Sequence, residues 1–330
     1  MITSILIYCL LSFISMYLCS IVSYKFDLVD LPNKRKVHSR PIAFTGGIII
    51  SIILCISILL FNISNNDLYF ISLMALLVSI FGLIDDKYHI SAASKLGLQI
   101  IPIIYLILFH NLSLDHLGNY DYIDLKMGIL GVPITLICVL FLINSFNYFD
   151  GFDGTLGFST ISTMSILLFL SSDKEINFFL VILLIPLITY LFFNFSIFKL
   201  PKLFLGDNGS LHLGFIISFI LIYLSNQNII HPILLAWSVV IFVYEFLSIN
   251  LIRLNNRKNL FLAGQDHLHH MLFKKTDSLF LTNLIISLTN IMLFIIGYIS
   301  FKLINPMTSL ILFIFIFFVF LISRNAYSQR

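Results

Sequence analysis

Residues 176–197 read INFFLVILLIPLITYLFFNFSI and contain no charged side chain. A run of about 20 apolar residues is long enough to cross the hydrocarbon core of a bilayer as a helix. The same character extends along the chain, of whose 330 residues 59% are hydrophobic and 11% are charged, whereas soluble domains carry about 25% charged residues. The sequence therefore predicts an all-α, polytopic integral membrane protein.

Further apolar runs lie on both sides of this one and bring the number of predicted transmembrane helices to about eleven. The expected spans are 2–24, 44–62, 68–84, 96–110, 128–146, 154–171, 176–197, 209–224, 229–252, 279–300 and 304–323. Cytoplasmic loops are enriched in Lys and Arg. With the N-terminus outside, 16 of the 19 basic residues fall on one side, and the exceptions are Lys126, Lys174 and Lys302. We therefore expect a cytoplasmic C-terminus.

The basic side also carries the polar motifs of the chain. We expect a single membrane-embedded domain over residues 1–330, with cytoplasmic loops at 25–43, 84–95, 146–154, 198–210 and 253–277. A topology that differed by one helix would place some of these loops on opposite sides of the membrane. Because the predicted topology puts them on one face, their side chains are expected to meet at one site.

The first motif, FGLIDDKYH at 81–89, ends an apolar run with the adjacent acids Asp85 and Asp86. Neighbouring carboxylates repel each other, and Mg²⁺ is commonly held by one or two carboxylates together with substrate phosphates. A solvated helix end is the alternative, although acids are disfavoured at a helix C-terminus by the macrodipole. Lys95 follows at the start of the next span and would either bind a phosphate or anchor the helix at the headgroups.

The second motif, NSFNYFDGFDG at 144–154, places Asn144, Asn147, Asp150 and Asp153 at three-residue spacing. Residues three apart share a helix face, so these oxygen-bearing side chains are expected to line one stripe. Unpaired acids are costly near a membrane, which indicates a polar ligand or a cation. An acidic turn punctuated by glycines is the alternative.

The third motif, KLPKLFLGDNGS at 199–210, opens a predicted helix at Asp207 between two glycines. The free N–H groups of a helix N-terminus favour anions, so this segment could bind a phosphate, with Asp207 as either a metal ligand or an N-cap. Phe204 could stack on a nucleobase, although aromatic residues at a membrane edge are often interfacial anchors.

The fourth motif, AGQDHLHHMLFKK at 263–275, holds His267, His269 and His270 in a predicted loop. Their spacing lacks the separation of common zinc ligands, so imidazoles that bind phosphate or act as acids fit better than a zinc site, with a solvated loop as the alternative. The basic stretch at 27–47, which includes His38, is either a phosphate-facing loop or an orientation signal. Glu245, inside a span, is either functional or paired with a neighbouring helix.

Taken together and in this order, the motifs resemble those of the polyprenyl-phosphate N-acetylhexosamine-1-phosphate transferases, glycosyltransferase family 4, over nearly the whole chain. The matching residues are Asp85–Asp86, then Asn144, Asn147, Asp150 and Asp153, then Phe204, Gly206, Asp207, Gly209 and Ser210, and finally His267, Leu268, His269 and His270. The chain departs from some relatives at His89, where they carry a further Asp, and at Gly264–Gln265, where they carry Asp-Arg.

The resemblance implies an enzyme of the bacterial cytoplasmic membrane whose active site faces the cytoplasm. Such an enzyme transfers N-acetylhexosamine 1-phosphate from a UDP-sugar to undecaprenyl phosphate, releases UMP and starts a lipid-linked surface glycan. Direct attack and a route through an aspartyl intermediate both remain open. The implied partners are these two substrates and the lipid bilayer, with room for a homodimer and no role for nucleic acid.

The resemblance also assigns roles to residues. It implies Mg²⁺, or Mn²⁺ in its place, bound by Asp207 and Asp85. The implied catalytic residues are Asp85, Asp86, Asp150, Asp153, His267, His269 and His270, and the implied substrate-binding residues are Lys95, Asn144, Asn147, Phe204 and His38.

Two other functions compete with this one. A transporter or flippase for a phosphorylated lipid or sugar would bury its polar residues at mid-membrane, often in paired repeats with broken helices. A CDP-alcohol phosphotransferase would need a longer acidic motif than residues 150–170 provide. The clustering of the acids on one face, with no visible internal repeat, favours the sugar-phosphate transferase.

Overall fold

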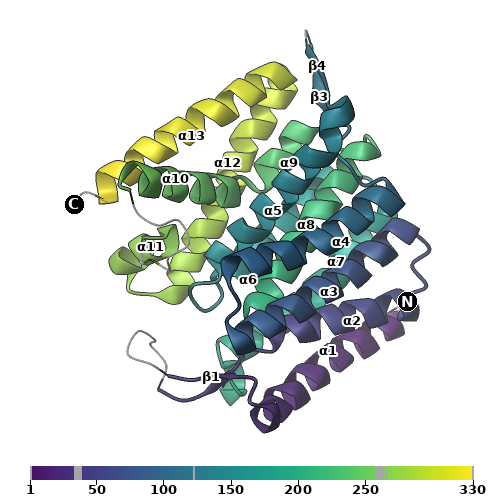
Figure 1. Cartoon of the computed structure of the whole chain (residues 1–330), viewed down its shortest axis with the longest axis vertical. Helices are drawn as coiled ribbons and strands as arrows, with labels where there is room; N and C mark the ends of the chain where they lie inside the picture. The colour runs from purple at the N-terminus through teal and green to yellow at the C-terminus, as the bar shows by residue number, and fades with distance from the viewer. Residues whose placement is uncertain (1, 33–38, 122, 258–263, 265, 329–330) are drawn as a thin grey trace. The chain divides into compact units, whose positions relative to one another are not determined.

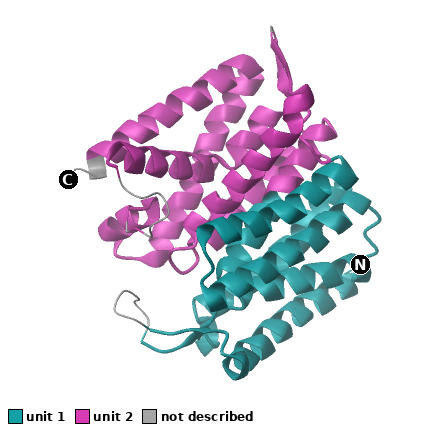
Figure 2. Ribbon diagram, viewed as in Figure 1, with its two compact units in different colours: residues 1–111, 173–217 teal, residues 112–172, 218–330 magenta. Residues whose placement is uncertain are grey.

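The computed structural model describes residues 2–32, 39–121, 123–257, 264 and 266–328, and it is predominantly α-helical (Figure 1). The chain divides into two compact units, coloured separately in Figure 2. Unit 1 comprises residues 1–111 and 173–217, and unit 2 comprises residues 112–172 and 218–330. The last of the three boundaries falls inside α8 (Asp207–Asn226), a continuous helix whose first half belongs to unit 1.

Unit 1 is a bundle of apolar helices with a small strand pair at one end. Its elements are α1 (Ile2–Val22), η1 (Ser23–Phe26), β1 (Val29–Asp30), β2 (Ile42–Ala43), α2 (Gly46–Leu60), α3 (Asn66–Tyr88), α4 (Ala92–His110), α7 (Lys174–Asn194) and η3 (Ile197–Lys199), followed by the start of α8. Helix α2 packs against α1, α3 and α7, and α3 packs against α4. Strands β1 and β2 pair in antiparallel fashion.

Unit 2 is organised around α12, which packs against α6, α9, α10, α11 and α13. Its elements are β3 (His116–Tyr120), β4 (Ile123–Lys126), η2 (Gly128–Leu130), α5 (Gly131–Phe149), α6 (Thr155–Leu170), α9 (Pro232–Ser238), α10 (Val240–Asn255), α11 (Leu268–Thr276), α12 (Leu279–Leu303) and α13 (Pro306–Ser328). Strands β3 and β4 form an antiparallel hairpin, and α10 packs against both α5 and α13.

The helices confirm the prediction of a polytopic membrane protein. Among the described residues, eight helices are long and apolar enough to cross a bilayer, and α9 with α10 makes a ninth if this pair, bent by 73°, is counted as one span. Helices α2 and α6 are apolar but have only 15 and 16 residues. Each of the apolar runs expected from the sequence is helical in the structure.

Exposure separates helices that suit lipid from helices that fill the interior. Of the most apolar 18-residue segment of α13, only 6% is buried, whereas 89% of the corresponding segment of α8 is buried. Lipid tails are as apolar as Leu, so an exposed apolar helix surface is stable in a bilayer. Helix α8 is therefore an interior helix, and its first turn carries the polar residues Asp207, Asn208 and Ser210.

The turn between α3 and α4 decides where several polar side chains lie. Helix α3 ends at Tyr88 because His89 adopts a left-handed conformation (φ 51°) and its N–H bonds the carbonyl of Asp85. Helix α4 begins at once, with the Ser91 hydroxyl accepting from the backbone N–H of Ser94 as an N-cap. The acids at the end of α3 and Lys95 in the first turn of α4 are thus brought to the same end of the bundle.

Candidate active site

Asp86 caps the N-terminus of α8. Its Oδ1 accepts from the backbone N–H of Asp207 at 2.9 Å, and its Oδ2 accepts from the backbone N–H of Asn208 at 3.1 Å and from the Asn208 side chain at 2.7 Å. A carboxylate at a helix N-terminus satisfies orphan N–H groups and complements the macrodipole. The anion expected at this helix start is therefore supplied, in the structure, by Asp86 of the chain itself.

Asp85 and Asp207 share a different partner. Lys95 Nζ lies 2.9 Å from Asp85 Oδ2 and also contacts Asp207 Oδ2. The second oxygen of Asp85 accepts from the backbone N–H of Ile90 at 3.1 Å. Two carboxylates from different helices thus converge on one ammonium group, which means that this place in unit 1 requires positive charge.

The segment before α8 is fixed by backbone contacts. A parallel bridge joins Ala43 to Leu203, and the N–H of Gly46 donates to the Phe204 carbonyl at 3.0 Å. The Asn208 side chain donates to the Phe44 carbonyl at 2.6 Å. Three of the sequence motifs, in the loops at 25–43, 84–95 and 198–210, therefore meet inside unit 1.

The ring of Phe204 is half-buried, and Lys202 Nζ lies 5.6 Å from its centroid. His38, which the sequence suggested as a substrate-binding residue, lies outside the described residues.

In unit 2, the Asn and Asp motif does not form the continuous helical stripe that the spacing predicted. Asn144 and Asn147 lie in α5, but this helix ends at Phe149, and Asp150 has non-helical angles (φ −83°, ψ 53°). Asp153 lies in the following turn. The stripe prediction was wrong for these two acids because the glycines break the helix, with Gly154 at a positive φ of 78° just before α6.

This turn is anchored from α12. The Asn283 side chain donates to the Asp153 carbonyl at 2.8 Å and accepts from the Thr155 hydroxyl at 2.8 Å. Asn283 carried no signal in the sequence, because an isolated Asn at the start of an apolar span looks like an interfacial residue. It fixes the backbone of the second motif where α6 begins.

The histidines lie at the start of a helix rather than in a loop. His267 precedes α11, and His269 and His270 lie in its first turn. The rings of His267 and His269 stack at 5.3 Å with an interplanar angle of 4°. The Phe152 ring meets the ring of His270 edge-on at 4.5 Å. The prediction of a loop was wrong because the segment after the histidines, with basic residues near its end, is itself a good helix former.

His269 lies directly against the second motif. A Cβ added to Gly151 would lie 2.2 Å from His269 Nε2, so only glycine leaves room for this ring. His269 is 2% exposed, and its Nε2 has no hydrogen-bond partner among the described residues. Buried polar atoms are nearly always paired, so this nitrogen is suited to contact a ligand.

Burial also keeps the imidazoles of α11 neutral. Burial lowers the pKa of His269 well below its usual value, and the neighbouring imidazoles of His267 and His270 lower it further, while the Glu245 carboxylate opposes the shift. Burial, followed by the influence of His267, also lowers the pKa of His270. Near neutral pH both side chains are therefore neutral. Each can donate a hydrogen bond from its ring N–H to a phosphate oxygen without adding a positive charge to the site.

These lowered pKa values predict a loss of stability in acid. Below the usual histidine pKa of about 6.5 the unfolded chain binds protons that the folded chain does not, so the free energy of unfolding falls as the pH drops, by about 1.4 kcal/mol per pH unit for each such imidazole. We expect the thermal unfolding midpoint in detergent to fall between about pH 6.5 and pH 5. We expect this dependence to be shallower in His269→Asn.

The exposed His89 provides a matched control. His89→Asn should retain the steep acid dependence of the wild type, since this side chain is not buried by folding. An unchanged slope in His269→Asn would contradict the assignment of the acid sensitivity to this buried ring.

A family model matches a stretch of the chain that includes the first three motifs but ends before the histidine motif. The family model for "Glycosyl transferase family 4" matches residues 68–225. The undecaprenyl-phosphate alpha-N-acetylglucosaminyl 1-phosphate transferase of Pasteurella multocida is 33% identical over 285 residues, which is 83% of this chain and 79% of that protein. The chain belongs to glycosyl transferase family 4. The resemblance identified from the motifs is thereby confirmed.

Other relatives of this glycosyl transferase family 4 chain carry the same name. The Haemophilus influenzae protein is 31% identical over 258 residues, 75% of this chain and 72% of its own length. The Yersinia pestis protein is 29% identical over 262 residues, 77% of this chain and 71% of its own length. The relatives give no support to the transporter alternative.

Sequence reasoning also missed residues that the structure places around the motifs. Asn208 was only a variable position within the third motif, yet its side chain joins the α2, α3 and α8 segments. Arg324 was counted only as a basic residue that sets orientation, yet it lies buried beside Glu245. Neither position had a local signal, because each acts through tertiary contacts.

Proposed function

We propose that this protein transfers N-acetylglucosamine 1-phosphate, or the 1-phosphate of a related N-acetylhexosamine, from a UDP-sugar to undecaprenyl phosphate, with release of UMP. The observation that supports this most directly is the combination of family membership with the cluster of Asp85, Lys95 and Asp207 in unit 1. The reaction forms a bond between an acceptor phosphate oxygen and the sugar-bearing phosphorus, and it breaks the bond from that phosphorus to the oxygen that leaves with UMP.

The cluster in unit 1 fits a hard divalent cation. Asp85 and Asp207 offer oxygen ligands from two different elements, and they already surround a positive charge at Lys95. Mg²⁺ prefers oxygen ligands of this kind, completed by substrate phosphates and water, and Mn²⁺ shares the preference. We propose these two acids as its ligands. When bound, the ion would neutralise charge that develops on the donor diphosphate.

The neighbours of the cluster have supporting roles in this proposal. Asp86 and Asn208 hold the first turn of α8, which fixes the backbone that carries Asp207. Lys95 is within reach of both acids and would pair with phosphate oxygens when substrates are present. The acceptor is already a phosphate with a second pKa near 6, so little base is needed, and Asp85 or Asp86 would remove any remaining proton.

The cluster in unit 2 is proposed to contact the donor. Beside Gly151, His269 presents a nitrogen that has no hydrogen-bond partner in the described part of the chain, and its ring contacts the rings of His267 and His270. The neutral imidazoles of His269 and His270 can donate hydrogen bonds to the diphosphate and to departing UMP. We assign Asn144, Asn147, Asp150 and Asp153 to the donor, and we assign stacking on a nucleobase to Phe204.

We infer an eleven-span topology with the N-terminus outside, the C-terminus in the cytoplasm and the functional motifs on the cytoplasmic face of a bacterial inner membrane. The eleven spans are the eight long helices, the bent pair of α9 and α10, and the shorter α2 and α6. The shorter helices rise about 22–24 Å at 1.5 Å per residue, so flanking residues must complete their crossing. The distribution of basic residues supports this orientation.

The direct test is a transfer assay with the purified protein. With Mg²⁺, undecaprenyl phosphate and UDP-N-acetylglucosamine we expect UMP and a lipid-linked sugar phosphate in equal amounts, and removal of the metal with EDTA should stop both. A panel of other UDP-N-acetylhexosamines establishes the preferred donor. Failure of every UDP-sugar to release UMP would contradict the proposal.

Sealed vesicles test the orientation in the same assay. UDP-sugars do not cross bilayers, so added donor should be used by inverted vesicles and not by right-side-out vesicles. Detergent should make the two preparations equal. Transfer by intact right-side-out vesicles alone would overturn the cytoplasmic assignment.

A further inference from the structure

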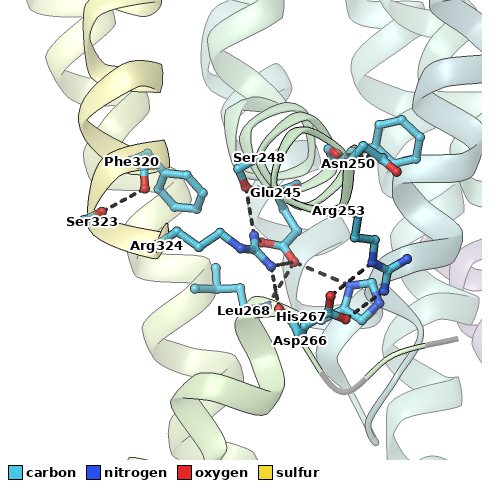
Figure 3. Close-up of polar contacts among 11 residues, drawn as sticks. Glu245, Ser248, Asn250, Arg253, Asp266, His267, Leu268, Phe320, Ser323 and Arg324 are labelled. Atoms are coloured by element: carbon cyan, nitrogen blue, oxygen red, sulfur yellow. Dashed lines mark hydrogen bonds and ion pairs between the residues drawn. The ribbon is translucent and has the colours of Figure 1, made fainter. Parts of the chain in front are cut away.

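A group of charged side chains lies around the beginning of α11, at the histidines (Figure 3). Glu245 of α10 is 1% exposed and Arg324 of α13 is 5% exposed. Burying charges is costly unless they are paired and hydrogen-bonded. The hydrogen-bond partners of Glu245 and Arg324 therefore show which parts of the chain these two residues connect.

Glu245 and Arg324 form a two-pronged pair. Arg324 Nη2 donates to Glu245 Oε1 at 2.9 Å, and Arg324 Nη1 contacts Glu245 Oε2. The same guanidinium donates to the Ser248 hydroxyl at 2.9 Å and to the Asp266 backbone carbonyl at 2.7 Å. One arginine from α13 thus connects α10 to the residue that precedes the histidine motif.

Glu245 also holds the first turn of α11 directly. Its Oε1 accepts from the backbone N–H of Leu268 at 3.0 Å and lies 3.5 Å from His267 Nδ1. The carboxylate therefore caps the helix N-terminus and faces the ring nitrogen of the first histidine. Figure 3 shows Arg324, Glu245 and His267 in this succession.

A second ion pair, between Arg253 of α10 and Asp266, holds the segment that precedes the histidines. Arg253 Nε donates to Asp266 Oδ2 at 3.0 Å, and Arg253 Nη2 donates to Asp266 Oδ1 at 2.7 Å. The bidentate fork fixes orientation as well as distance. The backbone of Asp266 is therefore tied to Arg324 and its side chain to Arg253, so the entry to the histidine motif is held from two helices.

We propose that Glu245 and Arg324 are positioning residues that fix His267 and the first turn of α11 for the transfer reaction, an inference that rests on the function proposed above. Replacing a buried ion pair by apolar residues of similar size often costs no stability, but apolar residues could not cap α11 or orient an imidazole. Neither residue needs to touch substrate, because both act through His267.

The kinetic test uses variants that leave no unpaired buried charge. The double variant Glu245→Leu with Arg324→Met should fold and should lower kcat by about 100-fold, the effect expected of misplacing a catalytic group by about 1 Å. Arg324→Lys should recover part of the activity, since it keeps the charge but loses the fork. Arg257→Met, at an exposed arginine that follows α10, is the matched control and should behave as the wild type.

A double-mutant cycle separates positioning from a general structural role. If Glu245 and Arg324 act through His267, adding the double variant to His267→Ala should lower kcat by less than about threefold. The reason is that the effects of groups that act as a unit are non-additive. An undiminished 100-fold loss in that background would overturn the proposal.

Hydrogen exchange tests the contact without relying on activity. In the double variant the Leu268 amide should exchange about tenfold faster or more, while protection in α12 remains. Unchanged protection at Leu268 would overturn the proposal even if activity fell. A wild-type protein that released no UMP from any UDP-sugar would instead defeat the proposed function, and the exchange result would still decide whether the contact positions α11.

Discussion

Asp207→Asn is expected to lower the rate of UMP release about a thousandfold. Asn preserves the shape of the side chain but removes the negative charge, and charge stabilisation by a bound metal ion is worth several kcal/mol, at about 1.4 kcal/mol for each tenfold in rate. The backbone N–H of Asp207 would still donate to Asp86, so the first turn of α8 should keep its cap. The fall in activity should therefore occur in a protein that is still folded.

The structure indicates why folding should survive this change. Lys95 would keep its contact with Asp85, at 2.9 Å, so the substitution does not leave an ammonium group without an acid. Expression, extraction into detergent and the thermal unfolding midpoint should stay close to wild type. These measurements distinguish loss of a ligand from loss of structure.

Asp121→Asn is the matched control for this substitution. Asp121 is exposed in the turn between β3 and β4, where its positive φ of 59° suits Asn as well as Asp. This variant should transfer at the wild-type rate. Turnover near normal in Asp207→Asn, with the control unaffected, would refute the assignment of Asp207 as a metal ligand.

Apolar length predicts the spans of this chain well and their ends less well. The run at 176–197 became α7 (Lys174–Asn194), which begins earlier because the Asp173 side chain accepts from the N–H groups of Glu175 and Ile176. A hydropathy pattern discards such polar caps, although they define where the helix starts. Boundaries therefore depend on residues that the apolar pattern does not count.

The break in the expected span at 229–252 shows what a pattern cannot reveal. Helix α9 ends and α10 begins around Val239 without a Pro or Gly to mark the bend. The Asn290 side chain of α12 donates to the Ser238 carbonyl at 3.2 Å and accepts from the N–H of Ile241 at 3.2 Å. The freed backbone groups are satisfied by a distant helix, so the contacts that accommodate the break come from about 50 residues away in the sequence.

The adjacent acids show the same limit at the candidate site. The sequence pointed to Asp85 and Asp86 as a pair that shares one cation, but consecutive residues on a helix do not face each other. In the structure Asp85 points to Lys95 while Asp86 points to the start of α8. The motifs proposed these residues as candidates, and only the tertiary arrangement separates a proposed ligand from a cap.

Gly47→Ala is expected to abolish transfer and to lower the free energy of unfolding by about 3 kcal/mol, the upper part of the range for overpacking. A Cβ at Gly47 would lie 2.0 Å from the Gly209 Cα and 2.1 Å from its backbone nitrogen. Backbone atoms cannot rotate away as a flexible side chain can. The start of α2 and the start of α8 would have to separate.

Separation would disturb the candidate site as well as the packing. The Asn208 Oδ1 accepts from the N–H of Ile48 at 2.6 Å, and the same side chain donates to Asp86. Moving α2 therefore displaces Asn208, and with it the cap that holds Asp207. Gly82 of α3 meets the same backbone, since a Cβ there would lie 2.5 Å from the Asn208 Cα, so the segment cannot shift toward α3 to make room.

Gly97→Ala is the matched control, because it adds the same methyl group at an exposed position of α4 where no heavy atom of the described residues lies within 4 Å. Replacing a helical glycine by alanine reduces the entropy of the unfolded chain, so this variant should be more stable by about 0.4–1 kcal/mol and fully active. Thermal unfolding and UMP release measured on both variants test the argument. Wild-type activity in Gly47→Ala would show that close backbone approach of α2 to α8 is not needed for the proposed reaction.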